Sequence, residues 1–325
     1  MTRIVALDGF CLTPATPAEA PKGEPTWDVL AGLGDLAVYP RTSPGEIVER
    51  CKDAELVLTN KVPFTADTLA QLPSLKYIGV TATGVNVIDL EAAKAHGVTV
   101  TNVPAYSTAS VAQHVFALIL SLNTALSETG QAVRDGRWAA GPDFCFTLQP
   151  WFELEGKTLG IVGMGTIGQA VARLGVAFGM HIAAHSRTEK TLDFPVSWLP
   201  VDELFRTANV ISLHCALTPE TQHLVNAERC ASMKDTAILI NTGRGPLVDE
   251  QALADALALG KPAAAGLDVL SQEPPAADNP LLTAPNCLIT PHLAWASVEA
   301  RHRCMATVSD NAARFLQGEP VNVMS

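Results

Sequence analysis

Short apolar runs alternate with helical patterns along almost the whole chain, and this alternation limits the fold more than any other feature. We expect a strand at each of eleven runs, at residues 3–8, 35–40, 55–60, 75–82, 99–103, 158–163, 181–186, 210–215, 237–243, 264–269 and 287–292. Strands that alternate with helices form a parallel sheet with helices on both faces. The sequence therefore predicts an α/β fold, with one set of strands before residue 104 and a second set after residue 156.

Two of the predicted helices carry residue types that favour helix ends. Asp89 and Asp249 stand where an N-cap would accept from free backbone amides, and Gly97 and Gly260 stand where left-handed backbone would end those helices. A further helix is expected from Ser297 to about residue 316.

The middle of the chain predicts a long helix followed by an arm. The helix should run from about Ser107 to Ser127, and because it is apolar on nearly every face it should be buried on several sides, between domains or between subunits. Residues 128–155 read as irregular, and an extended arm of this kind often wraps a partner subunit. Near the amino terminus, residues 14–25 read as a proline-rich surface loop.

The composition excludes several classes of protein. A chain of 325 residues has room for two domains, and 48% hydrophobic with 17% charged residues predicts a large core rather than disorder. The net charge of −11 and the absence of a lysine and arginine cluster argue against nucleic acid and anionic membranes as partners.

Seven scattered cysteines without a CxxC pair predict neither a disulfide framework nor a zinc site, so no metal is expected and a reducing compartment is favoured. The first residues lack the apolar core of a signal peptide, and the most apolar helix, at 110–122, is too short and too polar to span a bilayer. We therefore expect a soluble cytoplasmic protein.

The stretch GIVGMGTIGQAVA places Gly163, Gly165 and Gly168 in the spacing G-x-G-x-x-G. It follows an apolar strand and opens a helix, which is the context that a dinucleotide-binding turn requires. Such glycines let the backbone approach a pyrophosphate at the helix N-terminus. The alternative is a glycine-rich turn without a ligand.

The next strand, HIAAHSR, bears on the choice of nucleotide. Ser186 stands where NAD sites carry an acid for the adenosine ribose, and Arg187 follows it. Serine does not repel a 2′-phosphate and arginine can pair with one. These residues favour NADP(H) over NAD(H), although an arginine at a strand end is also commonplace.

Four reactive side chains follow the ends of three later strands. Arg244 follows one strand, Asp268 and Glu273 the next, and His292 the last. Parallel strands share one carboxyl edge, so these groups should gather where ligands bind. Singly, each has an ordinary explanation, such as a surface ion pair for Arg244, a solvated loop acid for Glu273 or a turn cap for Asp268.

Together the four groups predict carbonyl reduction. Arg244 can hold a carboxylate with its planar fork, and His292 can donate a proton to the carbonyl oxygen as hydride reaches carbon. Glu273 against His292 would stabilise the imidazolium and raise its pKa. Asp268 would accept from a carboxamide or orient the site.

These motifs resemble those of the D-isomer-specific 2-hydroxyacid dehydrogenases, most closely the branch of glycerate dehydrogenase and hydroxypyruvate reductase. The resemblance covers nearly the whole length and rests on GVTATGVNVID, YSTASVAQ, GMGTIGQAVA, LHCALT, NTGRG, LDVLSQEP, TPHLAW and GEPVNV. It implies two Rossmann-like, doubly wound parallel-sheet domains with an active-site cleft between them. The substrate-binding domain would comprise residues 1–103 and 291–325, the NAD(P)-binding domain residues 104–290, and the latter would form a homodimer.

The resemblance also implies the roles of individual residues. The catalytic set would be Arg244, Glu273 and His292. Substrate would be bound by Ala82, Thr83, Gly84, Arg244 and Trp295. The cofactor site would include Thr108, Gly163, Gly165, Thr166, Ile167, Gly168, Ser186, Arg187, His214, Thr218, Thr242 and Asp268.

The implied activity is the NAD(P)-dependent reduction of a small 2-oxo acid, such as hydroxypyruvate or glyoxylate, to the D-2-hydroxy acid. Ser186, Ala216 and Gln113 depart from the usual pattern; Ser186 bears on the choice of NAD, and neither Ala216 nor Gln113 touches the expected proton relay. The alternative is a nicotinamide-sensing regulator without catalysis, because corepressors of this fold keep the same residues. Formate oxidation is disfavoured, since formate dehydrogenases of the family carry glutamine where Glu273 stands.

Overall fold

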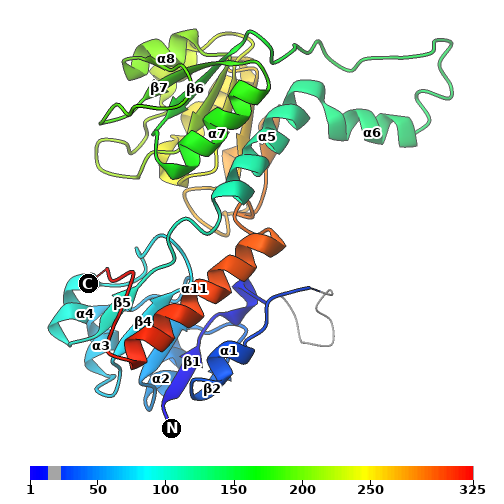
Figure 1. The fold of residues 1–325 in the computed structure, drawn as a ribbon. Coiled ribbons are helices and arrows are strands. Elements are labelled where there is room, and N and C mark those ends of the chain that lie inside the picture. The colour runs from blue at the N-terminus through cyan, green and yellow to red at the C-terminus, as the bar shows by residue number, and fades with distance from the viewer. Residues whose placement is uncertain (14–22, 325) are drawn as a thin grey trace. The chain divides into compact units, whose positions relative to one another are not determined.

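The computed structural model describes residues 1–13 and 23–324 and divides into two compact units (Figure 1). Unit 1 consists of Met1–Ser107 and Ala296–Ser325, and unit 2 of Thr108–Trp295. The boundaries lie a few residues beyond those expected at 103 and 290, because helix α5 and the turn after the last strand pack with the second sheet. His292 and Trp295 therefore belong to unit 2, with the glycine turn. Most of the expected proline-rich loop at 14–25 lies outside the described residues.

Unit 1 is built on a five-stranded parallel sheet in the order β2-β1-β3-β4-β5. Its strands are β1 (Arg3–Ala6), β2 (Asp35–Val38), β3 (Leu56–Thr59), β4 (Tyr77–Val80) and β5 (Thr99–Thr101). Its helices are η1 (Gly9–Cys11), α1 (Asp28–Ala31), η2 (Pro44–Glu46), α2 (Ile47–Cys51), α3 (Ala66–Ala70), α4 (Leu90–Ala95) and α11 (Val298–Leu316). The carboxyl-terminal helix α11 packs on β4, with the rings of Phe315 and Tyr77 4.8 Å apart, so both ends of the chain build this unit.

Unit 2 is built on a seven-stranded parallel sheet in the order β12-β11-β10-β9-β6-β7-β8. Its strands are β6 (Thr158–Val162), β7 (His181–His185), β8 (Ser197–Trp198), β9 (Val210–Leu213), β10 (Ile238–Asn241), β11 (Ala264–Leu267) and β12 (Cys287–Ile289). Its helices are α5 (Thr108–Thr124), α6 (Leu126–Arg134), α7 (Thr166–Ala177), α8 (Val201–Thr207), α9 (Ala227–Ser232), η3 (Gly245–Leu247), α10 (Glu250–Ala258) and η4 (Pro280–Leu282). The α/β class and all eleven predicted strands are confirmed, and among the described residues the two-residue β8 is the one strand that was not expected.

Successive residues of the strands in unit 2 face two separate cores. On β10, Leu239 packs among side chains of α8, α9 and α10, whereas Ile238 and Ile240 pack among side chains of α5 and α7. All three are buried. This alternation is what a parallel sheet covered by helices on both faces requires.

The predicted helix ends are confirmed. The Asp89 carboxylate accepts from the amide of Ala92 and the Asp249 carboxylate from the amide of Ala252, at 2.9 and 3.0 Å. Gly97 and Gly260 have φ values of 71° and 74°, the left-handed backbone that ends a helix.

The prediction of a single helix over 107–127 is wrong. The helix breaks at Ala125, whose φ of 47° is left-handed, and α6 then continues through residues that were expected to be irregular. Helix α5 is buried against α7, β10 and β11, whereas no residue of α6 is buried. Within residues 1–13 and 23–324, no single helix has the length and apolarity needed to cross a bilayer. Helices α5 and α6 reach this length and apolarity only when they are counted together, and a bend of 56° separates them.

Candidate active site

The carboxyl ends of neighbouring strands in unit 2 carry most of the residues that the sequence singled out. Gly163 follows β6, Arg244 follows β10, Asp268 follows β11 and His292 follows β12. Strands β6 and β9 form the switch point of the sheet, because the chain builds outward in opposite directions from them. Ligands of doubly wound sheets bind at this point.

The three motif glycines meet different surroundings. A Cβ on Gly163, whose φ is 99°, would lie 2.5 Å from the backbone nitrogen of Cys215, and one on Gly168 would lie 2.2 Å from the carbonyl oxygen of Gly163. A Cβ on Gly165, the N-cap of α7, would meet no atom within 4 Å. Two glycines thus permit close packing, and the third leaves open backbone at a helix N-terminus, which fits the approach of a pyrophosphate.

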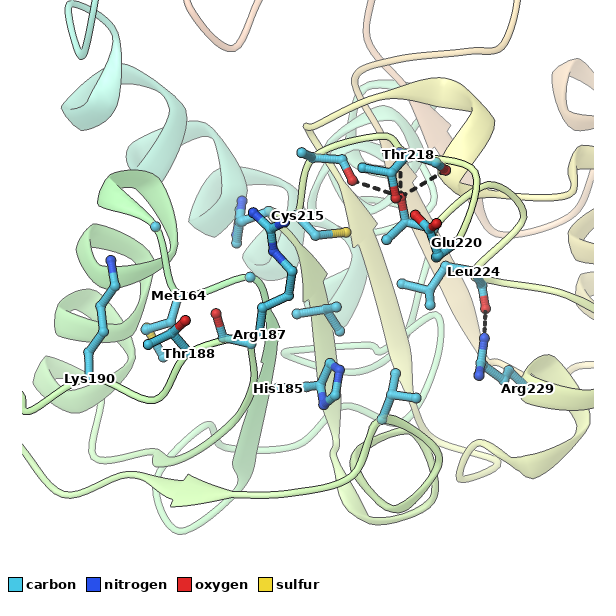
Figure 2. A pocket seen from close by; sticks show the side chains of 18 residues that line it. Met164, His185, Arg187, Thr188, Lys190, Cys215, Thr218, Glu220, Leu224 and Arg229 are labelled. Atoms are coloured by element: carbon cyan, nitrogen blue, oxygen red, sulfur yellow. Dashed lines mark hydrogen bonds between the residues drawn. The ribbon is translucent and has the colours of Figure 1, made fainter.

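A pocket of about 830 Å³ opens beside this turn, between the loops that follow β6, β7 and β9 (Figure 2). Six of the residues expected at the cofactor line it, namely Gly163, Gly165, Ser186, Arg187, His214 and Thr218. The other six lie elsewhere in unit 2: Thr166, Ile167 and Gly168 in the first turn of α7, Thr108 at the start of α5, Thr242 after β10 and Asp268 after β11.

The pocket also contains charged residues that sequence reasoning missed. Lys190 and Glu220 lie on the same loops as Arg187 and Thr218, whereas Arg229 comes from α9. Figure 2 shows Arg187 and Lys190 on the loop after β7 and Glu220 on the loop after β9. Lys190 follows Arg187 by three positions, so the sequence could have indicated it. Nothing local in the sequence connects Arg229 to the pocket.

Three titratable groups of the pocket have shifted pKa values, and burial raises that of the Cys215 thiol. Burial lowers the pKa of His214 to about 4, so the imidazole is neutral near pH 7, and its Nε2 lies 2.8 Å from the Ser212 hydroxyl. A hydrogen bond from Thr218 is the main cause of a lowered pKa at Glu220, and the charge of Arg187 adds a smaller effect. Glu220 is therefore an anion within reach of the Arg187 charge.

His292 and Glu273 form a close pair. The Nδ1 atom of His292 lies 2.6 Å from Oε2 of Glu273, while the amide of Leu270 donates to Oε1 at 3.2 Å. Both side chains are about one third exposed, at 28% and 34%. The carboxylate accepts from Nδ1, and within the described part of the chain the Nε2 atom of His292 makes no hydrogen bond. The ring therefore presents one nitrogen to a reactant.

Trp295 is tied to the same turn. Its indole Nε1 donates to the carbonyl oxygen of His292 at 2.8 Å. The backbone of His292 has a φ of 52°, and its amide donates to the carbonyl oxygens of Asp268 and Thr290. A substrate-binding role of Trp295 would therefore involve only the ring surface that this bond leaves free.

Arg244 is exposed at the end of a tightly packed turn. The Asn241 side chain binds this turn twice, donating to the Arg244 carbonyl at 2.8 Å and accepting from the Gly243 amide at 3.0 Å. A Cβ on Gly245 would lie 2.0 Å from the carbonyl carbon of Leu270, so the turn packs directly on the segment that leads to Glu273. Among the described residues Arg244 forms no ion pair, which disfavours its alternative explanation as a surface ion-pair partner.

Thr242 is half-buried after β10. Its hydroxyl is buried and has no hydrogen-bond partner among the residues that the structure describes. An enclosed hydroxyl cannot reach a ligand without a rearrangement. A contact of Thr242 with a cofactor would therefore involve its backbone or its methyl group.

The expected substrate residues Ala82, Thr83 and Gly84 lie in unit 1, directly after β4. The Val103 amide donates to the carbonyl of Ala82, and the Thr83 hydroxyl donates to the carbonyl of Val103 at 2.8 Å. Asn102 donates to the carbonyl of Thr83, also at 2.8 Å. These bonds fix the loop against the segment after β5.

Comparison with known proteins identifies the family. Residues 116–294 match the family described as "D-isomer specific 2-hydroxyacid dehydrogenase, NAD binding domain". The chain is 44% identical to a hydroxypyruvate reductase of Blautia hydrogenotrophica, over 99% of both chains. It is also 44% identical to a glycerate dehydrogenase of Methylorubrum extorquens, over 87% of this chain and 89% of the relative.

A solved structure is similar over the full length. It is an NADPH-dependent glyoxylate/hydroxypyruvate reductase of Sinorhizobium meliloti in complex with NADP and malonate, with a TM-score of 0.82 and 29% identity over 100% of this chain and 97% of that one. These relatives are enzymes, and they give no support to a regulator without catalysis. The chain is an NAD(P)-dependent oxidoreductase and belongs to the D-isomer specific 2-hydroxyacid dehydrogenase family.

Proposed function

We propose that this dehydrogenase reduces a small 2-oxo acid of the hydroxypyruvate or glyoxylate type to the D-2-hydroxy acid. The observation that carries the proposal is the 2.6 Å contact between His292 and Glu273, in the unit that also contains the open glycine turn. The names of the relatives support the same substrate class.

His292 is the proton donor in this proposal. Glu273 accepts from Nδ1, which holds the ring in one orientation and stabilises the imidazolium. Nε2 then carries the proton that passes to the carbonyl oxygen of the substrate. The nicotinamide, when bound, supplies the hydride that reaches the adjacent carbon.

Arg244 holds the substrate carboxylate in this proposal. Its guanidinium is exposed and unpaired by any described carboxylate, so it can form a bidentate contact with a 2-oxo acid. The backbone of Ala82, Thr83 and Gly84 is proposed to bind the same carboxylate. Trp295 would limit the size of the substrate group that is attached to the carbonyl carbon opposite the carboxylate.

The cofactor is proposed to be NADP(H) in preference to NAD(H). Ser186 brings no negative charge to the pocket, and Arg187 and Lys190 form no ion pair within the described residues. Arg229 differs, because Asp202 accepts from its Nε at 2.8 Å and balances its charge. Two pocket cations that form no ion pair among the described residues favour a 2′-phosphate, whereas the charge of Glu220, which interacts with Arg187, opposes one.

We also propose a cytoplasmic homodimer. All seven cysteines are free, as a reducing compartment requires. Four large apolar side chains of α6 and the following arm are more than half exposed, namely Leu126, Trp138, Phe144 and Trp151. Burying them against a second copy would remove this apolar surface from water, and sedimentation of the purified chain as a monomer would contradict this part.

Steady-state kinetics of two substitutions test the catalytic proposal. His292→Ala should lower kcat for hydroxypyruvate by roughly two orders of magnitude or more, because a positioned general acid contributes on that scale, with the Kd for NADPH unchanged. Glu273→Gln should lower kcat less, because a neutral partner still orients the ring. The control is His181→Ala, which removes an exposed histidine at the amino end of β7. Near-normal turnover of His292→Ala would refute the assignment.

A further inference from the structure

The backbone of His292 requires support from its surroundings. Its φ of 52° lies in the left-handed region, which costs a residue other than glycine roughly 1 kcal/mol or more. The turn that contains His292, residues 290–294, must therefore be held by other contacts if the imidazole is to keep its place beside Glu273.

Asp268 supplies most of those contacts. It is 1% exposed, and its Oδ1 accepts from the Leu293 amide at 2.9 Å while Oδ2 accepts from the Ala294 amide at 2.8 Å. Its own carbonyl accepts from the amide of His292 at 2.8 Å. Donors at three consecutive positions thus converge on one buried residue.

Thr290 adds a fourth contact and extends it to another helix. Its hydroxyl lies 2.6 Å from Oδ1 of Asp268 and 3.0 Å from Nε2 of His114, which belongs to α5. The carboxylate can only accept, so the Thr290 proton goes to Asp268 and the hydroxyl oxygen accepts from Nε2 of His114. His114 therefore carries a proton on Nε2, which also lies 3.6 Å from Oδ1 of Asp268.

The same helix binds the turn a second time. Ser110, one helical turn before His114, donates its hydroxyl proton to the carbonyl of Ala294 at 2.6 Å. Helix α5 thus contacts the turn on both sides of His292, through Thr290 before it and Ala294 after it. The core packing of α5 makes it a rigid support.

We infer that Thr290 is a positioning residue for His292: its hydroxyl joins Asp268 to His114 and so fixes the turn in which the imidazole meets Glu273. The inference rests on the proposed role of His292 as the proton donor. It assigns Asp268 to the support of this turn, because each carboxylate oxygen already accepts from the protein. A misplacement of about 1 Å in a reacting group can lower a rate roughly 100-fold, so the support has a kinetic effect.

Two substitutions distinguish the effect of the Thr290 hydroxyl from the effect of the side chain's volume. Thr290→Val keeps the shape and removes the hydroxyl, whereas Thr290→Ser keeps the hydroxyl and removes a methyl group. We expect kcat for hydroxypyruvate to fall about 10- to 100-fold in Thr290→Val and to stay within about threefold in Thr290→Ser. The Kd for NADPH should change little in either variant, because Thr290 does not line the nucleotide pocket.

The pH profile provides a readout that a purely structural role would not move. Weaker alignment with Glu273 stabilises the imidazolium less, so the upper limb of the kcat/KM profile should shift to lower pH in Thr290→Val only. Unchanged kcat and profile in Thr290→Val would overturn the inference, and so would equal losses in the valine and serine variants. Either result leaves the proton-donor role to be judged separately by His292→Ala.

A second pair of variants applies if Thr290→Val does not fold. His114→Leu removes the donor to Thr290, and His114→Gln offers a replacement amide donor. Lower kcat in the leucine variant with recovery in the glutamine variant would support the inference. A kcat equal to that of the wild type in both variants would overturn the inference.

Discussion

Replacing Gly165 with alanine should weaken cofactor binding without unfolding the protein. The new Cβ meets no protein atom within 4 Å, and the backbone at φ −74° and ψ −167° is open to any residue, so the free energy of unfolding should change by less than about 1 kcal/mol. The methyl group would instead occupy the surface that the pyrophosphate approaches. We expect the Kd for NADPH to rise about 10- to 100-fold, which corresponds to about 1.4–2.7 kcal/mol.

Replacing Gly168 with alanine should instead lower the stability of the fold. Its Cβ would lie 2.2 Å from the Gly163 carbonyl oxygen, about 1 Å closer than atoms normally approach, and backbone must move to admit it. Overpacking of this kind costs about 1–3 kcal/mol, and the better helix propensity of alanine returns up to about 1 kcal/mol. A net loss of about 1–2 kcal/mol would lower the Tm by about 2–8 °C.

The assay compares both variants with the wild type by thermal unfolding without nucleotide and by fluorescence titration with NADPH. The pair tests whether the open surface at Gly165 is the place where nucleotide binds, because both substitutions are the same chemical change in one motif. An unchanged Kd in Gly165→Ala would refute the reasoning. Equal thermal destabilisation of the two variants would refute the packing argument for Gly168.

Three further predictions concern specificity and stability. Ser186→Asp should lower the ratio of kcat/KM for NADPH to that for NADH by about tenfold or more, because a carboxylate repels a 2′-phosphate; an unchanged ratio would mean that the adenosine end is recognised elsewhere. Thr242→Val should leave the free energy of unfolding unchanged or raise it by up to about 1 kcal/mol in urea titrations, because it removes a buried hydroxyl without a described partner; a loss above this amount would reveal a bond that the hydroxyl makes. Burial lowers the pKa of His214 to about 4, so the unfolded chain binds the proton more readily and stability should fall as the pH drops from about 6.5 to 4; His214→Gln should remove part of this fall, and equal acid sensitivity of both proteins would contradict it.

Much of the fold could be predicted because apolar runs and capping residues are local signals. The burial of β10 on both faces follows from an unbroken apolar run, and Asp89 and Asp249 cap helices as their spacing indicates. The break at Ala125 has no such signal, since alanine favours a helix and rarely adopts a positive φ. Strand β8, with two residues, is too short to show a periodicity.

The candidate site was predictable wherever a strand end determined the position of a residue. Arg244, Asp268 and His292 share one sheet edge because parallel strands share a direction. The support of the His292 turn was not predictable, because His114 and Thr290 are 176 positions apart and meet only after α5 packs on the sheet. The same reason applies to Arg229, whose place in the pocket depends on the packing of α9.

The most direct test of the central claim is the oxidation of NADPH and NADH, measured in parallel with hydroxypyruvate, glyoxylate and pyruvate at neutral pH. We predict turnover with hydroxypyruvate or glyoxylate, and a higher kcat/KM with NADPH than with NADH. Absence of turnover with all three acids, from protein that binds the nucleotide, would contradict the claim that His292 serves in a 2-oxo acid reductase.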